Sequence, residues 1–194
     1  GANVDCKPIH LLEFALMGSV YANHIHNISN PTVGLLSVGE EKSKGDLLTT
    51  EAHELLEKSS LNFVGNVEGR DVLKGDVNVI VCDGFVGNVI LKFAEGVLGF
   101  LKTKFREFAN QGILNKARVG LAYGTLKNIL KDFDYQEYGG VPLLGVNGVS
   151  IIGHGRSSPK AIMNMILKAE HMIRAKINDI IEEKIKDIKE YSIK

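Results

Sequence analysis

The segment TVGLLSVG, residues 32–39, is followed by LLTTEAHELLE, residues 47–57, and then by LNFVG, residues 61–65. The first and third segments are short apolar runs that glycine ends, a pattern typical of buried strands. The middle segment predicts a helix. A strand, a helix and a second strand in this order favour a mainly parallel α/β sheet, because parallel strands need a long crossover connection.

The alternation continues on both sides of this segment. Residues 77–81 predict another strand, and Asn147-Gly148 predicts a hairpin within residues 143–152. The remaining helices are expected over residues 8–26, from residue 89 onward, over about 114–130, and from Pro159 to about Lys189. The predicted fold is therefore α/β, a mainly parallel sheet with helices on both faces and a helical protrusion around residues 89–131. No linker or repeat interrupts it, so we expect one domain over residues 1–194.

The composition excludes several classes of protein. The chain has 194 residues, 44% of them hydrophobic, with 23 basic and 23 acidic side chains. This balance argues against a disordered tail or a nucleic-acid-coating protein. Cys6 and Cys82 are too few for a disulfide framework, and no segment approaches the roughly 20 uninterrupted apolar residues of a membrane span. We expect a cytoplasmic protein.

Glycine-rich polar loops follow the predicted strands. Because the carboxyl ends of parallel strands meet at one edge of a sheet, these loops are expected to lie together. Glycine lets backbone N–H groups approach a ligand closely, and a helix N-terminus after such a loop favours phosphate. The loops are GAN (1–3), GEEKSKG (39–45), GNVEGRD (65–71), DGFVGN (83–88) and GHGRSS (153–158).

Signatures of other chemistries are missing. The chain has no G-x-x-x-x-G-K-[ST] motif, no G-x-G-x-x-G between a strand and a helix, and no G-x-S-x-G elbow. His24 and His26 alternate, and Cys6 and Cys82 lie far apart, so no metal site or cofactor is predicted. The sequence predicts phosphate cradles without a protein nucleophile.

These loops, in this order, resemble one family. GANVDCKP (1–8), VCDGFVGNVILK (81–92), YGGVPLLGVNG (138–148) and HGRSS (154–158) are similar to the C-terminal part of the phosphate acyltransferases (PlsX type) of bacterial phospholipid synthesis. The resemblance covers nearly the whole chain. It implies a fold similar to isopropylmalate dehydrogenase and phosphotransacetylase, and a larger family fold of which an N-terminal part is absent here.

The resemblance also implies an activity. Such an enzyme moves a long acyl group from acyl carrier protein to inorganic phosphate, and a membrane glycerol-3-phosphate acyltransferase uses the acyl phosphate. It implies a homodimer without a cofactor. Three alternatives stay open: a short-chain enzyme that uses coenzyme A, a dehydrogenase of the isopropylmalate type, and a non-catalytic fragment that binds phosphate, carrier protein or membrane. The dehydrogenase is disfavoured because no aspartate cluster suits a divalent metal.

In such a reaction phosphate is itself the nucleophile, so the protein must position it and stabilise the tetrahedral oxyanion. Our catalytic candidates are His154 as an acid or oxyanion donor, Lys92 for charge balance, and Asn88 as an uncharged donor. Lys92 on a solvated face and Asp83 as a helix cap are the competing structural interpretations. The candidates for binding phosphate or substrate are Asn3, Glu40, Lys44, Asn66, Asp83, Gly84, Gly87 and Ser157.

A local basic block contrasts with the neutral chain. Residues 100–131 contain seven basic side chains and one acidic side chain, Glu107, which suggests an acidic partner. Four of its residues are candidate contacts for carrier protein or an anionic membrane surface: Lys102, Lys104, Phe105 and Arg106. The alternative is an ordinary helix pair whose apolar side chains face a core or a dimer partner.

Overall fold

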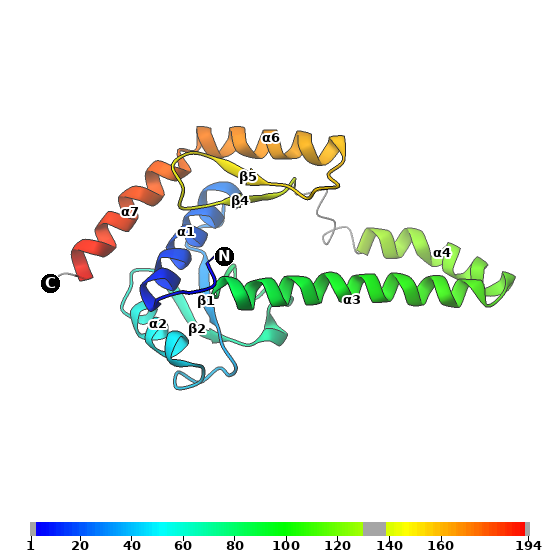
Figure 1. Ribbon diagram of the computed structural model, residues 1–194, viewed down its shortest axis with the longest axis horizontal. Coiled ribbons are helices and arrows are strands. Elements are labelled where there is room, and N and C mark those ends of the chain that lie inside the picture. The colour runs from blue at the N-terminus through cyan, green and yellow to red at the C-terminus, as the bar shows by residue number, and fades with distance from the viewer. Residues whose placement is uncertain (1–2, 130–138, 193–194) are drawn as a thin grey trace. The chain divides into compact units, whose positions relative to one another are not determined.

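The computed structural model describes residues 3–129 and 139–192 (Figure 1). It also describes their side chains, except those of residues 127–129 and 189–192. Two compact units make up the chain. The first contains residues up to 88, residues 143–150 and residues from 169 onward; the second contains residues 89–142 and 151–168. The single domain predicted from the sequence stays a prediction. The elements, in order, are α1 (Pro8–His26), β1 (Thr32–Leu36), α2 (Leu47–Glu57), β2 (Asn62–Val67), the short 3₁₀ helix η1 (Gly69–Asp71), β3 (Val79–Val81), α3 (Gly84–Asn110), α4 (Ile113–Ile129), β4 (Val141–Leu143), β5 (Ser150–Ile152), α6 (Pro159–Arg174) and α7 (Ile177–Ser192).

The first unit is built on a parallel sheet. Its strand order is β2-β1-β3, and β1 pairs in parallel with both neighbours. The predicted parallel α/β architecture is therefore confirmed for this sheet. All three strands end at the same edge, which we call the carboxyl edge. Helices on both faces and the likeness to isopropylmalate dehydrogenase or phosphotransacetylase stay predictions.

Helices α1 and α2 cover this sheet and pack against each other. Pro8 occupies the first turn of α1, where its missing N–H costs nothing. Both helices have the bounds that the sequence predicts. Their inward faces meet the strands in one apolar core, which consists of Leu11, Leu12, Ala15, Val33, Leu35, Ala52, Leu56 and Val81.

Strand β2 contains an irregularity that the sequence did not predict. Val33 pairs with Phe63, but the next residue, Gly34, pairs with Gly65, so Val64 is an extra residue in β2. This is a β-bulge. The predicted strand ended before Gly65, and this was wrong: Gly65 lies inside the strand with φ +99°, a conformation that side chains disfavour, and pairing continues to Val67.

The C-terminal helix also differs from the prediction. One helix from Pro159 to about Lys189 was expected, but α6 ends at Arg174 and α7 begins at Ile177. Lys176 between them has φ +51°, in the left-handed region, which ends an α-helix. Helix α7 then packs against α1 within the first unit.

The predicted hairpin is present. Strands β4 and β5 pair, and Asn147-Gly148 lies in the loop between them. The Asn178 side chain on α7 holds this loop, because its Nδ2 donates to the carbonyl oxygens of Val146, at 2.9 Å, and Gly148, at 2.7 Å.

Helix α3 is long and exposed. It begins at Gly84, five residues before the predicted start, and Gly84 is its only buried residue. Within the described residues it is the one helix whose length and composition would allow it to cross a membrane, with a mean hydropathy of 1.5 over 18 residues, of which 6% are buried. Lys92 and Glu95 interrupt this stretch, which explains why no uninterrupted apolar span was found.

Candidate active site

The carboxyl edge of the parallel sheet brings three of the predicted loops together. The loop after β1, residues 39–45, is closed by its own hydrogen bonds. Ser37 Oγ donates to the Lys44 carbonyl oxygen, and the Lys44 N–H donates to the Glu41 carbonyl oxygen, both at 2.9 Å. Gly45 ends the loop with φ +121°, and a Cβ there would lie 2.1 Å from Thr49 Oγ1. The loop therefore needs glycine at this position.

Asp46 joins this loop to helix α2. Its Oδ1 accepts hydrogen bonds from the Thr49 N–H at 2.8 Å and the Thr49 hydroxyl at 2.7 Å. These donors satisfy a free N–H of the first helical turn and lower the pKa of the Asp46 carboxyl.

Two contacts tie the loop after β1 to the end of β2 and the residues that follow it. Asn66 Nδ2 donates to the Glu41 carbonyl oxygen at 2.9 Å. The Arg70 guanidinium reaches Glu40 Oε1 at 3.4 Å and Glu68 Oε2 at 3.0 Å. Since Arg70 and Glu40 are exposed, their ion pair contributes roughly 0–1 kcal/mol. The bond from Asn66, whose side chain is buried, is therefore the stronger link.

The backbone of the first described residue, Asn3, is hydrogen-bonded to the chain just after β3. The Gly84 N–H donates to the Asn3 carbonyl oxygen at 2.7 Å. Asp83 caps α3: its Oδ1 accepts from the Val86 N–H at 2.8 Å, and its carbonyl oxygen accepts from the Gly87 N–H at 3.0 Å. Three N–H groups of the first turn are thus occupied, which weakens the prediction that they cradle an anion.

The two cysteines lie beside this edge as free thiols. Cys6 Sγ donates to the Asn3 carbonyl oxygen at 3.3 Å. Burial is the main cause that raises the pKa of both Cys6 and Cys82. A thiol with a raised pKa stays protonated and is a weak nucleophile. That no protein nucleophile attacks the substrate stays a prediction.

The remaining candidates, in the loop after β1 and on α3, are exposed. Lys44 and Asn88 both face solvent. Lys92 forms an ion pair of 2.9 Å with Glu95 one turn along α3, with both side chains about two-thirds exposed (67% and 65%). This geometry agrees with the interpretation of Lys92 as a residue on a solvated face.

His154 and Ser157 belong to the second unit, in the loop before α6. The Arg156 N–H donates to His154 Nδ1 at 3.1 Å, and Ser157 Oγ donates to the His154 carbonyl oxygen at 2.6 Å. Because Nδ1 accepts a hydrogen bond, the neutral imidazole carries its proton on Nε2.

Six of the predicted site residues lie at the carboxyl edge within the first unit: Asn3, Glu40, Lys44, Asn66, Asp83 and Gly84.

Sequence reasoning assigned nothing to His53, yet this residue is buried behind the edge. It is 6% exposed on α2, and its Nδ1 lies 2.8 Å from Asn66 Oδ1. The available signal was a histidine on the same helical face as Ala52 and Leu56, both of which are fully buried. A polar residue on an apolar face usually has a buried hydrogen-bond partner.

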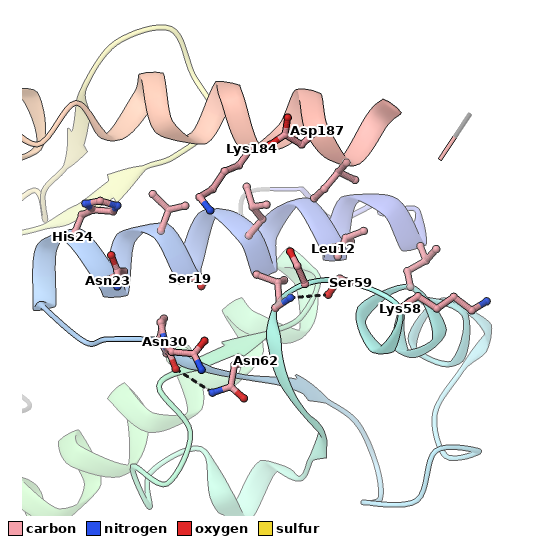
Figure 2. A pocket seen from close by; sticks show the side chains of 17 residues that line it. Leu12, Ser19, Asn23, His24, Asn30, Lys58, Ser59, Asn62, Lys184 and Asp187 are labelled. Carbon is pink, nitrogen blue, oxygen red and sulfur yellow. Dashed lines mark hydrogen bonds between the residues drawn. The ribbon is translucent and has the colours of Figure 1, made fainter. Parts of the chain in front are cut away.

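No group of three or more His, Cys, Asp or Glu side chains could hold a metal ion in residues 3–129 and 139–192. A groove of about 1320 Å³ lies elsewhere in the first unit, between α1, α7 and the segments that precede β1 and β2 (Figure 2). Figure 2 shows Lys184 and Asp187 on α7 above it, and the hydrogen bond from Asn62 to Asn30 below. Because these two asparagines stand at the amino ends of β2 and β1, the groove is at the opposite edge from the predicted site.

Comparison with known proteins gives the family. A family model described as "Fatty acid synthesis protein" matches residues 1–180. The chain belongs to this family. Its relatives include a phosphate acyltransferase of Pelotomaculum thermopropionicum, 50% identical over 188 residues, which are 97% of this chain and 55% of the relative. A phosphate acyltransferase of Desulforudis audaxviator is 51% identical over 191 residues, 98% of this chain and 57% of the relative.

A third relative is the phosphate acyltransferase of Chlorobaculum parvum, 48% identical over 189 residues, 93% of this chain and 55% of the relative. The resemblance to phosphate acyltransferases is thus confirmed. The chain spans about half the length of the curated relatives that it matches.

Proposed function

We propose that the protein transfers a long-chain acyl group from acyl carrier protein to inorganic phosphate, within fatty acid and phospholipid synthesis. The observation that carries this proposal is the linked carboxyl edge in a chain about half identical to named phosphate acyltransferases. The edge carries the exposed side chains of Lys44 and Asn3, and burial raises the pKa of its two cysteines. Such a site suits an anionic nucleophile that comes from solution.

The reaction balances without a protein nucleophile. A phosphate oxygen attacks the thioester carbonyl carbon, and an oxyanion forms on the carbonyl oxygen. The carbon–sulfur bond then breaks, and the thiolate leaves and takes up a proton. The products are acyl phosphate and the free thiol of the carrier protein. The protein contributes position and electrostatic stabilisation.

Lys44 is the residue of the edge that best balances the charge of phosphate, because its side chain is exposed on a loop held by three hydrogen bonds. The Asn3 and Asn88 side chains supply uncharged donors from the same unit. Glu40 serves this site indirectly, through its ion pair with Arg70. Lys92 has a weaker claim, since Glu95 holds its ammonium.

His154 serves as a donor to the oxyanion in this proposal. Its Nδ1 accepts the Arg156 N–H, so the neutral imidazole carries its proton on Nε2, the atom that donates to the carbonyl oxygen of the substrate in the proposed reaction. A neutral imidazole held in this tautomer donates a hydrogen bond without giving up a proton. Ser157 supports the same loop through its bond to the His154 carbonyl oxygen.

The partners follow from the basic block. Lys104 lies over the Phe100 ring, 5.6 Å from its centroid, and pairs with Glu107 at 2.8 Å. Phe100 is 59% exposed and Phe105 41% exposed. Such a mixed apolar and basic surface suits acidic acyl carrier protein, an anionic membrane surface at the inner face of the cytoplasmic membrane, or the second copy of a homodimer. A membrane glycerol-3-phosphate acyltransferase is the proposed consumer of the product.

The activity is tested on purified protein whose intact mass is measured first, with acyl carrier protein thioester and phosphate as substrates and acyl hydroxamate as the readout. Turnover that requires phosphate supports the proposal. The matched variants are Lys44→Gln at the edge and Lys58→Gln at the opposite edge. We expect about a tenfold or larger loss for the first and no loss for the second, by analogy with one lost charged hydrogen bond. Turnover with short acyl coenzyme A alone favours a short-chain phosphate acyltransferase that uses coenzyme A. Binding of phosphate or carrier protein without turnover favours a non-catalytic fragment.

The membrane contact has its own test. Liposomes that contain anionic lipid should sediment with the protein, and Lys102→Glu with Phe105→Ala should abolish this. The control pair, Lys58→Glu with Leu73→Ala, makes the same kinds of change on the first unit, where Leu73 is 71% exposed, and should leave sedimentation unchanged. Sedimentation that the first pair leaves unaffected would exclude these two residues from the contact, and binding of carrier protein is then measured on the same variants.

A further inference from the structure

A chain of two hydrogen bonds, the first of them buried, links helix α2 to the exposed loop after β1. His53 on α2 meets Asn66 at the end of β2, and Asn66 meets the Glu41 carbonyl oxygen within the loop. His53 is 6% and Asn66 9% exposed. Solvent therefore cannot replace the buried bond between His53 and Asn66 at low cost, since an unsatisfied buried polar group costs free energy.

The Glu41 carbonyl oxygen is the point on which the loop depends. It accepts two hydrogen bonds, from Asn66 Nδ2 and from the Lys44 N–H, both at 2.9 Å. The second bond closes the turn that carries the Lys44 side chain. Any contact that fixes the orientation of the Asn66 amide therefore also fixes the backbone position of Lys44.

The carbonyl of Glu41 sets the orientation of the Asn66 amide. An amide turned by 180° would place Oδ1 against the Glu41 oxygen, and two acceptors would face each other. With Nδ2 toward Glu41, Oδ1 faces His53, and an amide oxygen only accepts. His53 must then donate from Nδ1, so its neutral tautomer carries the proton there.

The bulge in β2 makes this arrangement possible. The Phe63 ring meets the His53 ring edge-on, with centroids 5.0 Å apart, and Asn66 bonds the same imidazole. In a regular strand residues 63 and 66 point to opposite faces, because side chains alternate. The extra residue Val64 places both side chains on the face that α2 covers.

We propose that His53 is a positioning residue: through Asn66 it holds the Glu41 carbonyl, and so fixes where the loop presents Lys44 to phosphate. The part that concerns phosphate rests on the proposed function. The part that concerns the loop does not, and it is tested separately.

The structural arm compares matched variants. An asparagine side chain in place of His53 would put an N–H where Nδ1 stands, whereas glutamine puts it near Nε2, so His53→Asn restores the bond and His53→Gln does not. Asn66→Asp keeps the acceptor for His53 but removes the donor to Glu41. Trypsin cleaves after Lys42 and Lys44, in the loop itself. We expect cleavage there to accelerate about tenfold in His53→Gln and in Asn66→Asp, the effect of one lost hydrogen bond. In His53→Asn the rate of cleavage should stay within about twofold of wild type.

Two results would overturn the proposal. One is equal cleavage in the His53→Gln and His53→Asn variants. The other is a ¹⁵N NMR spectrum of the wild-type protein in which the His53 imidazole carries its proton on Nε2, a measurement that needs no variant to fold. Circular dichroism establishes that the variants keep their helices before either comparison is made.

The catalytic arm uses the acyl phosphate assay. We expect His53→Gln to raise the KM for phosphate about tenfold with kcat within about twofold, and His53→Asn to restore the wild-type KM. A purely structural role would lower the amount of active enzyme, and thus the apparent kcat, at an unchanged KM; that result would also refute the proposal. A wild-type protein without turnover would refute the proposed function instead, and the trypsin and NMR results would still decide the loop.

Discussion

The peptide N–H of Gly84 lies 2.7 Å from the carbonyl oxygen of Asn3, so the start of the described chain is fastened to the carboxyl end of β3. The same carbonyl oxygen accepts the Cys6 thiol at 3.3 Å. Asn3 therefore reaches the edge by its backbone, and its side-chain amide remains exposed at the place where the proposed reaction needs an uncharged donor. The two residues are 81 positions apart in the sequence, which makes this contact a test of the tertiary fold.

Asp83 next to this contact provides the first prediction. Asp83→Ala should lower the free energy of unfolding by about 1 kcal/mol, because the Val86 N–H loses its cap. Asp83→Asn keeps an oxygen acceptor and should stay within about 0.3 kcal/mol of wild type. Urea titration measures both, with the exposed Asp76→Ala as the control. If Asp83→Asn abolished turnover at unchanged stability, Asp83 would act on the substrate as well.

Gly45 provides the second prediction. Gly45→Ala should lower the free energy of unfolding by about 2 kcal/mol, because φ +121° is strained for alanine and its Cβ would meet Thr49 Oγ1 at 2.1 Å. Gly69→Ala is the matched control: a Cβ there meets no atom within 4 Å, and the change should stay within about 0.5 kcal/mol. Similar losses in both variants would show that the loop does not have the described conformation.

Asp46 predicts a dependence on pH. Hydrogen bonds from Thr49 lower the pKa of its carboxyl in the folded chain, so the unfolded chain binds the proton more readily. The resulting stabilisation is fully present above the unfolded pKa of about 4 and is lost as the pH falls through the lower, folded value. Asp46→Asn keeps the cap without the charge. The difference in unfolding free energy between wild type and Asp46→Asn should be about 0.5 kcal/mol at pH 6 and vanish on acidification toward the folded pKa. A difference that stays constant over this range would contradict the assignment.

Lys176 predicts a gain in stability. Its φ of +51° is unfavourable for a side chain with a Cβ, whereas glycine adopts it freely. Lys176→Gly should raise the free energy of unfolding by about 0.5–1 kcal/mol. Lys184→Gly, inside α7, should lower it by about 1 kcal/mol. Thermal unfolding of the two variants should therefore shift in opposite directions.

The parts of the fold that local rules determine were predictable. Helix α2 has its predicted bounds, and Pro8 marks the start of α1. Gly65 was misread as the end of a strand because glycine ends strands far more often than it forms a bulge. The break at Lys176 left no signature, since lysine rarely adopts a positive φ. Gly87 and Asn88 have low helix propensity, which hid the first turn of α3 behind an apparent loop.

The candidate site, too, was predictable from the sequence only in part. Parallel topology was enough to place the loops after β1, β2 and β3 at one edge. The function of each donor there was not predictable, because it depends on competing partners: Asp83 faces its own helix, and Asn66 faces His53 and Glu41. The part played by His53 depends on a contact between side chains on different elements, which no spacing along the sequence encodes. Whether His154, Lys92, Asn88 and Ser157 join the site stays a prediction.

The bulge at Val64 makes β2 sensitive to the number of its residues more than to their identity. The Val64 side chain is 49% exposed, so the strand can accept a different residue there. Deletion of that residue, however, would restore regular alternation and turn Asn66 and everything after it to the opposite face. Among related sequences, a gap in this strand would thus have a larger effect on the loop beyond β1 than many substitutions in the loop itself. A loop that looks locally encoded has its register kept by a neighbouring strand.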